Sequence, residues 1–408
     1  MRIGYPCVNE TLACSAATTF RLASYSAERL VPTVAANLAC LRQILEWNVA
    51  HGLLFFRLGS GIVPFGSHEI NTHPWQQEFR GEFEELGRYM RQHGMRISFH
   101  PDQFVVLNSP DPAIVQRSVD ELIYQGSLLD LMGLDASAKL QIHAGGVYGD
   151  KPAALARWAD TFHTRLPEAV KRRLVVENDD RLYSLRDCLD LHEMTGVPIL
   201  FDNFHHECLH HGEPMREALR LAAATWDPVR DGPLMMDYSS QAPGERRGKH
   251  TDSLVPTLFR EFLTHVEELE LDMMLEIKDK EASAVAGARV LRELGLLAPA
   301  PAGYAYPEFA PRPATTDAEG KLLVAKPKKR KIAKPVPSAA DAAPAPAAEA
   351  TDDTTAMATA PAASAEAKQV TTGPKSKAEM RSKVTVEAVD LLISKPAAQP
   401  RARKIPTV

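Results

Sequence analysis

The sequence contains no apolar run long enough to cross a bilayer, which takes about 20 residues. Its first residues, MRIGYPCVNE, lack the basic region and the apolar region of a secretory signal. Its five cysteines form no CxxC pair and show no spacing typical of a disulfide framework. These absences predict a protein of the reducing cytoplasm that makes no contact with a membrane.

Positive charge is not in excess either, because the formal net charge at pH 7 is −5. Nucleic-acid-binding proteins usually carry an excess of Lys and Arg at least locally, so the overall charge indicates no such partner but can conceal a basic patch. The first apolar run is followed by neither GxGxxG nor a Walker motif, the loops that hold nucleotide phosphates. A nucleotide-binding doubly wound fold is therefore disfavoured.

Aromatic residues become rare after about residue 303, where Ala, Pro, Thr and Lys dominate. A segment of that composition cannot bury enough apolar surface to fold. We therefore predict a folded domain of residues 1–303 and a mostly disordered tail of residues 304–408. The tail includes the basic run PKKRKIAKP.

Eight short apolar runs alternate with amphipathic stretches of helical periodicity before that boundary. The runs are RIGYP, LLFFRLG, RISFHP, KLQIHAG, LVVEND, ILFDN, LMMDYS and MMLEIKD. Such alternation predicts parallel strands surrounded by helices. Eight units of this kind in about 300 residues favour a TIM (β/α)8 barrel, an α/β fold, over an open sheet.

Each predicted strand ends in a polar residue, and the carboxyl ends of the strands are where TIM barrels carry their chemistry. These strand-end residues are Tyr5, Arg57, His100, His143, Glu177, Asp202, Asp237 and Glu276. One histidine here would more often be a hydrogen-bonded core residue, but two imidazoles and four carboxylates buried together would cost several kcal/mol per unpaired charge. Bound cations are the simpler explanation.

The ligand types indicate which metals and which chemistry fit. Histidine and carboxylate without cysteine favour Mn²⁺, Fe²⁺, Zn²⁺ or Mg²⁺. The residues exceed the needs of one ion, and two or more ions can activate water and hold a phosphodiester. The strand ends therefore predict phosphoryl hydrolysis.

Several loop residues extend this prediction. His205 follows Asp202 by three residues, and His250 lies in the loop GERRGKHTDS, so both can join the metal cluster. Arg246 and Arg247 in the same loop suit phosphate contact, with a solvated charged loop as the alternative. His210 and His211 are expected to be solvated loop residues.

Two further loops concern the substrate. Gln103 and Phe104, in HPDQFVVLNS, are expected to project beside His100 and fill space in an opened base stack, with a capped turn and a buried Phe as the alternative. His68 lies in the Gly- and Ser-rich loop GSGIVPFGSHE and can lie over the metals.

Several motifs occur together and in order: GYPCVNETL, SFHPDQFVVLNS, QIHAGG, VVENDD, FDNFHH, GKHTDS and LEIKDKE. Together they resemble the UV damage endonuclease family over about the first 300 residues. The resemblance implies a TIM barrel, similar to the endonuclease IV type, with up to three divalent ions, commonly Mn²⁺. It implies cleavage of the DNA backbone immediately 5′ of cyclobutane dimers, 6-4 photoproducts and some abasic sites.

The resemblance also assigns roles by motif. The implied metal ligands are His100, His143, Glu177, Asp202, His205, Asp237, His250 and Glu276. Gln103 and Phe104 match a Gln-Tyr pair that wedges into the duplex, Tyr5 and Asn9 match positions lining the lesion pocket, and His68 matches a position near the metals. Lys278 is expected to meet a phosphate, unless it pairs with Asp279 or Glu281.

The sequence departs from the family pattern on the seventh strand. Some members carry a modified lysine two residues before a histidine ligand, where this chain has Met235 and Asp237. Asp237 is a shorter and anionic ligand, so a different metal geometry is expected there.

We therefore hypothesise a DNA repair endonuclease that leaves a 3′-hydroxyl and a 5′-phosphate. A hydroxide generated near Glu276 and Glu177 attacks the phosphorus in line, with His250 and Lys278 as further catalytic residues. The partner is damaged double-stranded DNA in the cytoplasm, at the nucleoid, and no obligate protein partner is indicated. Two alternatives stay open: a divalent-metal sugar isomerase or epimerase on the same fold, and a non-catalytic DNA-binding scaffold that uses the basic tail.

Overall fold

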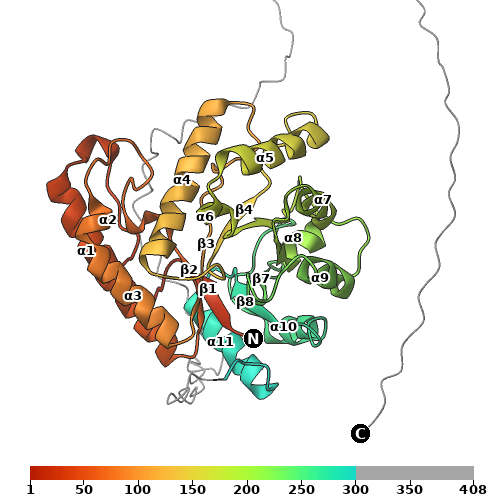
Figure 1. Cartoon of the computed structure of the whole chain (residues 1–408). Coiled ribbons are helices and arrows are strands. Elements are labelled where there is room, and N and C mark those ends of the chain that lie inside the picture. The colour runs from red at the N-terminus through yellow and green to blue at the C-terminus, as the bar shows by residue number, and fades with distance from the viewer. Residues whose placement is uncertain (300–408) are drawn as a thin grey trace, which may run out of the picture. The chain divides into compact units, whose positions relative to one another are not determined.

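The protein forms a closed barrel of eight parallel strands, described by a computed structural model for residues 1–299 (Figure 1). The strands are β1 (Ile3–Pro6), β2 (Phe55–Leu58), β3 (Arg96–Phe99), β4 (Lys139–His143), β5 (Leu174–Glu177), β6 (Ile199–Asp202), β7 (Leu234–Tyr238) and β8 (Leu271–Leu275). Each strand pairs with the next, and β8 pairs with β1. The predicted TIM barrel is confirmed, whereas the predicted tail, residues 304–408, lies outside the described residues.

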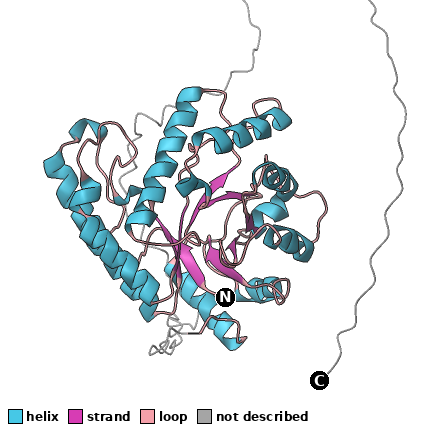
Figure 2. Ribbon diagram, viewed as in Figure 1, coloured by secondary structure: helices cyan, strands magenta, loops and turns pink. Residues whose placement is uncertain are grey.

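Helices surround the strands on all sides of the ring (Figure 2). They are α1 (Ala27–Ala50), α2 (Trp75–Glu78), α3 (Arg80–Gln92), α4 (Pro112–Leu131), α5 (Lys151–Arg165), α6 (Glu168–Lys171), α7 (Leu185–Thr195), α8 (Asn203–Cys208), α9 (Met215–Ala223), α10 (Pro256–Leu263) and α11 (Glu281–Glu293). None of the helices within residues 1–299 combines the length and the apolar character that crossing a membrane requires.

Local sequence signals set several helix ends. Gly52 and Gly94 follow α1 and α3 with φ of 70° and 60°, the left-handed conformation that glycine adopts without strain. Ser184 and Asp187 cap the start of α7 reciprocally.

The end of the barrel where the strands begin is closed by charged pairs. Lys139 Nζ lies 2.6 Å from Asp231 Oδ1, and Arg96 Nη1 lies 3.0 Å from Asp272 Oδ2, with all four residues buried. Breaking one such pair would leave an uncompensated buried charge, which typically destabilises a protein by about 3–5 kcal/mol. At this end of the barrel, the buried carboxylates are therefore neutralised by Lys and Arg side chains of the same chain.

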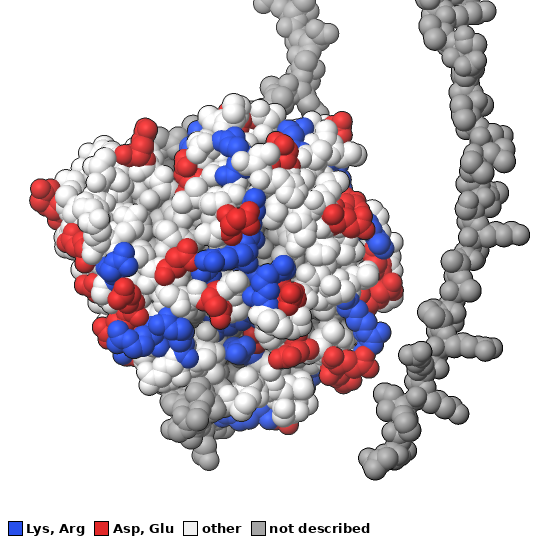
Figure 3. All heavy atoms as spheres, in the orientation of Figure 1, with Lys and Arg blue, Asp and Glu red and all other residues white. Residues whose placement is uncertain are grey.

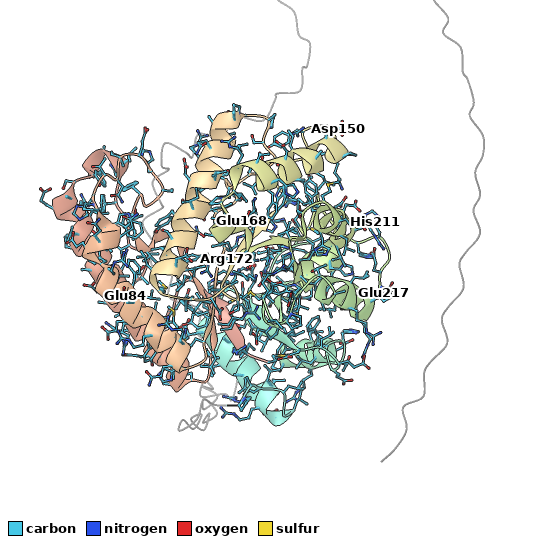
Figure 4. All side chains as sticks on the ribbon, viewed as in Figure 1. Glu84, Asp150, Glu168, Arg172, His211 and Glu217 are labelled. Carbon is cyan, nitrogen blue, oxygen red and sulfur yellow. A yellow bond between two sulfur atoms is a disulfide. The ribbon has the colours of Figure 1, made fainter. Side chains whose placement is uncertain are left out.

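Surface charges outside the barrel are mixed. Figure 3 shows Lys and Arg side chains lying next to Asp and Glu on the face that it draws. Arg172, labelled in Figure 4 just after α6, illustrates this, since its Nη2 lies 3.2 Å from Asp130 Oδ1 on α4. Mixed charge of this kind suits a solvated surface better than a surface for binding a polyanion.

The sequence prediction for the cysteines is wrong at one pair. Cys14, in the loop after β1, and Cys40, on α1, form a disulfide, with their Cα atoms 5.8 Å apart. The two residues are 26 positions apart, and only the packing of α1 against this loop brings them together. Sequence spacing therefore gave no signal for this bond.

Two glycines of the same helix give a matched test of the packing between α3 and α4. A Cβ on Gly87 would lie 1.7 Å from the carbonyl oxygen of Met132, whereas a Cβ on Gly81 would meet nothing within 4 Å. Gly87→Ala should therefore lower the free energy of unfolding by about 1–3 kcal/mol. Gly81→Ala should leave it unchanged or raise it by up to about 1 kcal/mol, because alanine favours helix. Urea denaturation of the full chain checks both, and equal effects would contradict the packing.

Candidate metal centre

Polar side chains from β3 to β8 and the residues just after them converge at the carboxyl end of the barrel. They form three overlapping groups, in each of which the candidate ligand atoms lie within 4.8 Å of one another. The groups are His100, His143 and Glu177; Glu177, Asp202 and His205; and Asp202, Asp237 and Glu276. The structure thus brings together seven of the residues that the sequence suggests as ligands.

Glu177 at the end of β5 joins the first two groups, and its two oxygens face different partners. Oε2 lies 3.2 Å from His100 Nε2 and 3.5 Å from His143 Nε2, while Oε1 lies 3.2 Å from His205 Nδ1. Two ligands bonded at about 2.1 Å to one tetrahedral or octahedral ion lie about 3.0–3.4 Å apart. The spacing therefore suits a carboxylate that bridges two cations.

Unsatisfied buried atoms support the same interpretation. Asp202 Oδ2 and His143 Nδ1 are buried without a hydrogen-bond partner. A buried carboxylate oxygen without a partner is unfavourable, because it has lost its water and gained nothing in return. Asp202 Oδ2 lies 3.6 Å from His205 Nδ1, a distance that a shared cation would bridge. These residues fit a divalent ion in both ligand type and spacing.

The electrostatics of the protein residues alone also indicate a shortage of positive charge. Burial raises the pKa of Asp202 to about 6, although His205 opposes the shift. Burial would lower the pKa of His205, but Asp202 and Glu177 outweigh it and raise that pKa to about 11. A proton on His205 thus supplies a positive charge among these carboxylates. A metal ligated by His205 must displace this proton, so binding at neutral pH releases it.

Arg57 and Gln141 belong to this centre, although the sequence analysis named Arg57 only as a polar strand end without a role and did not identify Gln141. Arg57 Nη2 donates to both oxygens of Asp237, at 2.6 and 2.7 Å, and to Gln141 Oε1 at 2.7 Å. Its Nη1 donates to Glu276 Oε1. Gln141 Nε2 donates to Glu177 Oε2 and to Asp237 Oδ2, each at 2.6 Å. The signal that could have identified Arg57 is a charged residue within the otherwise apolar strand FFRL.

His250 lies beside these three groups but is not a member of them. Its Nδ1 is 2.8 Å from the carbonyl oxygen of Glu276, and its ring centroid is 6.1 Å from that of His205. The loop after β7 returns over the barrel through the pairing of Gln241 with His250. With Nδ1 donating to a carbonyl, Nε2 stays available for a ligand.

A cavity of about 1160 Å³ opens above the metal-centre residues. Its floor includes Arg57, His100, His143 and Glu276, and its walls carry Gln103 and Phe104 on the loop after β3. Phe104 is 45% exposed, so the alternative of a buried ring is wrong. Basic side chains line the cavity on the loops after β7 and β8: Arg246, Lys249, Lys278 and Lys280. The hollow is therefore basic and open, with an aromatic ring at its edge.

Tyr5 and Asn9 do not line this cavity, contrary to the sequence expectation. Tyr5 is fully buried, and its ring packs on Trp47 and Phe56. Its hydroxyl donates to Asn48 Oδ1 and accepts from Asn9 Nδ2, and Asn9 is 2% exposed. Both side chains support the wall between β1 and α1, because Tyr5 faces out of the barrel.

Three other residues that the sequence predicts to contact the substrate differ in their positions relative to the cavity. His68 is exposed on the loop after β2 and is not among the residues lining the cavity. Arg247 does not line it either and donates to the carbonyl of Glu207 at 2.7 Å. Lys278 lines the cavity, but its partner is Asp252, 2.5 Å away, and not Asp279 or Glu281.

The remaining histidines of FDNFHHECLHH lie away from the metal groups. His206 is buried, with Nε2 3.1 Å from the carbonyl of Glu213. His210 and His211 are exposed, and Figure 4 shows His211 at the edge of the molecule. The prediction of solvated loop residues is confirmed for His210 and His211.

Comparison with known proteins identifies the relatives of this chain. The family model described as UV-endonuclease UvdE matches residues 1–298. The UV DNA damage endonuclease of Clostridium perfringens (strain 13 / Type A) is 35% identical over 295 residues, which cover 72% of this chain and 71% of that protein. The UV DNA damage endonuclease of Bacillus cereus (strain Q1) is 30% identical over 293 residues, covering 69% of this chain and 91% of that protein.

A solved structure shows the same likeness. The crystal structure of SacUVDE is 42% identical in sequence and superposes with a TM-score of 0.69. The match covers 73% of this chain and 100% of that chain. Sequence and fold thus point to the same group of proteins.

Replacing Glu177 should weaken metal binding at both of the ligand groups that share it. We expect Mn²⁺ to raise the melting temperature of the wild-type chain, because an ion that binds only the folded state stabilises it. Glu177→Gln should remove most of this increase. Glu121→Gln changes another buried carboxylate, which accepts from Ser67 and Gln125 outside the metal groups, and should keep the increase. Equal responses of the two variants, measured by differential scanning fluorimetry with and without EDTA, would contradict the bridging role.

Proposed function

The chain belongs to the UV-endonuclease UvdE family, and we propose that it is a metal-dependent DNA repair endonuclease. Its substrate is double-stranded DNA with a UV photoproduct, a cyclobutane dimer or a 6-4 photoproduct, or with an abasic site. It nicks the backbone immediately 5′ of the lesion and leaves a 3′-hydroxyl and a 5′-phosphate. The observation that carries the proposal is a carboxylate, Glu177, shared by two ligand groups, one of which contributes His100 and His143 to the lining of an open basic cavity.

The residues that would hold the ions are those of the first two groups, His100, His143, Glu177, Asp202 and His205. Divalent ions bound there would supply Lewis-acid activation of water and neutralise charge at the phosphate. Mn²⁺ is the proposed ion, and the oxygen and imidazole ligands also suit Mg²⁺, Zn²⁺ or Fe²⁺.

Residues around the ions have roles that follow from their positions. Glu276 has a side chain that is 22% exposed and uses Oε1 for Arg57, which leaves Oε2 to accept a proton from the attacking water. His250 can offer Nε2 to an ion or to the phosphate, because its Nδ1 is held by the carbonyl of Glu276. Arg246 and Lys278 line the cavity, where they can contact the DNA backbone.

Lesion selection would rest on the ease of deforming the duplex. A dimer weakens pairing and stacking, so turning it out of the stack costs less than turning out normal bases. Gln103 and Phe104 lie at the cavity wall, where an amide and a ring can fill the space that the extruded bases leave. The cavity has a volume of about 1160 Å³ and opens to solvent, which suits an extended polymer.

The remaining expectations stay proposals. We place the enzyme in the cytoplasm at the nucleoid, with damaged DNA as its partner and no obligate protein partner. The sugar isomerase or epimerase alternative has no specific observation in its favour. The scaffold alternative depends on the basic run PKKRKIAKP, which lies outside the described residues.

Cleavage of a defined duplex tests the proposed function. An end-labelled duplex with one thymine dimer should be nicked just 5′ of the lesion by the wild type with Mn²⁺ and not with EDTA. Glu276→Gln should lower the rate at least about 100-fold, since it removes a proton acceptor, whereas Glu121→Gln should cleave at the wild-type rate. If the folded, metal-loaded protein nicks no lesion duplex, the proposed function is wrong, and activity on free sugars becomes the next assay.

Phe104 has its own test. Stacking of a base on an aromatic side chain contributes about 1–3 kcal/mol, so Phe104→Ala should lower cleavage of the dimer duplex about 10- to 100-fold. Leu258→Ala removes a similarly exposed apolar side chain on α10 and should cleave normally. The wedge assignment would fail if both variants cleaved as the wild type does in single-turnover assays.

A further inference from the structure

Arg57 enters the metal centre as a fixed positive charge. We propose that its guanidinium replaces a divalent cation: it neutralises Asp237 and Glu276, so the chain binds two ions and none at the group of Asp202, Asp237 and Glu276. The two ions belong to the groups that share Glu177. This inference rests on the metal centre of the proposed function and corrects the expectation that Asp237 is a metal ligand.

The hydrogen bonds of Asp237 support this assignment. A carboxylate has about four lone-pair sites. In Asp237, Oδ1 accepts from Arg57, and Oδ2 accepts from both Arg57 and Gln141. By contrast, Asp202 Oδ2 is buried without a hydrogen-bond partner, and His205 Nδ1 lies 3.6 Å from it. The chain therefore already satisfies Asp237, whereas it leaves Asp202 to be satisfied by an ion.

The position of Arg57 is fixed by its surroundings. Its side chain is 2% exposed and lies on β2 inside the barrel. Gln141 is fully buried and accepts from Arg57 with its oxygen while its nitrogen donates to Glu177 and Asp237. This pattern fits only one orientation of the amide, because carboxylates only accept. Gln141 thus links the guanidinium to the bridging carboxylate Glu177 and holds both in place.

Charge repulsion disfavours an ion at the third group. The Nη2 nitrogen lies 2.6 Å from Asp237 Oδ1, so an ion bonded to that oxygen at about 2.1 Å would lie within about 5 Å of the guanidinium. Like charges at such a separation repel strongly in a buried site. Glu276 is held in the same way through Oε1, and its Oε2 stays available to the attacking water.

The total charge gives an independent argument. The four carboxylates of the centre and the Arg57 guanidinium carry a formal charge of −3. Two divalent ions bring the sum to +1, which one DNA phosphate would balance. Three ions bring it to +3, an excess of positive charge that these four carboxylates do not offset. Two ions are the number that the described residues neutralise best.

Metal content of the full chain tests the proposal. The wild type, stripped with a chelator, reloaded with Mn²⁺ and gel-filtered, should contain two Mn²⁺ per chain by mass spectrometry of the metal. Arg57→Met keeps a long side chain without the charge and should contain three, with its third ion held at least tenfold tighter in titration calorimetry than any third ion of the wild type. Arg57→Lys keeps the charge and should contain two.

A double variant supplies the matched control. Arg57→Met with Asp237→Asn removes the cation and one anion together and should return to two ions. The proposal would be overturned if the wild type contained three Mn²⁺ per chain or fewer than two. It would also be overturned if folded Arg57→Met contained the same number of ions as the wild type. Should Arg57→Met not fold, the wild-type count decides. If the wild type binds two ions but does not cleave a dimer duplex, the proposed function is wrong and this inference stands. If the wild type cleaves the duplex and binds three ions, this inference is wrong and the proposed function stands.

Discussion

The concentration of negative charge at the carboxyl end of the barrel is the constraint on which the rest of the site depends. Glu177, Asp202, Asp237 and Glu276 meet there, and Arg57 is the guanidinium that hydrogen-bonds to two of them. At the opposite end, buried carboxylates are paired directly with Arg96 and Lys139. The two ends of one barrel thus differ in their source of cations: the chain supplies them at one end, and at the other it leaves a deficit that metal ions fit.

The barrel turns this deficit into a defined geometry. The parallel strands β3 to β8 and the residues just after them deliver polar side chains to the same rim, and the closed ring fixes the spacing of these residues within a few ångströms. Glu177 is placed between two groups of ligands, and Gln141 holds it from below. The loops after β3 and β7 then add Phe104 and Arg246 at the cavity above, where a large anionic substrate can enter. Function in this chain comes from the rim and its loops, and the apolar strands provide the support.

Much of this arrangement could be predicted from the sequence. Alternating strand and helix patterns predicted the barrel. Six polar strand ends, together with His205, predicted the convergence of seven candidate ligands. What the sequence did not specify is the face of each strand end. Tyr5 faces outward to α1, whereas Arg57, equally near the end of its strand, faces inward to Asp237. A polar residue near the end of a predicted strand can face into the barrel or out of it, because consecutive side chains of a strand alternate between the two faces of the sheet. The sequence alone does not show which face applies.

Long-range contacts account for the other differences. The sequence predicts Asp237 as a ligand from its place on β7, whereas our proposal that Arg57 neutralises it depends on hydrogen bonds that span 180 positions of the chain. The Cys14–Cys40 disulfide and the contact of Arg247 with Glu207 likewise depend on how loops pack on the barrel. Side-chain identity predicted which chemistry is present, while packing decided which residues take part in it.

Anomalous diffraction from crystals of the full chain soaked in Mn²⁺ tests the central claim most directly. Our account predicts two strong peaks, one among His100, His143 and Glu177 and one among Glu177, Asp202 and His205, with none against Asp237 beside Arg57. Absence of ions from both Glu177 groups, in crystals that bind Mn²⁺ elsewhere, would contradict the claim that this rim is a metal centre.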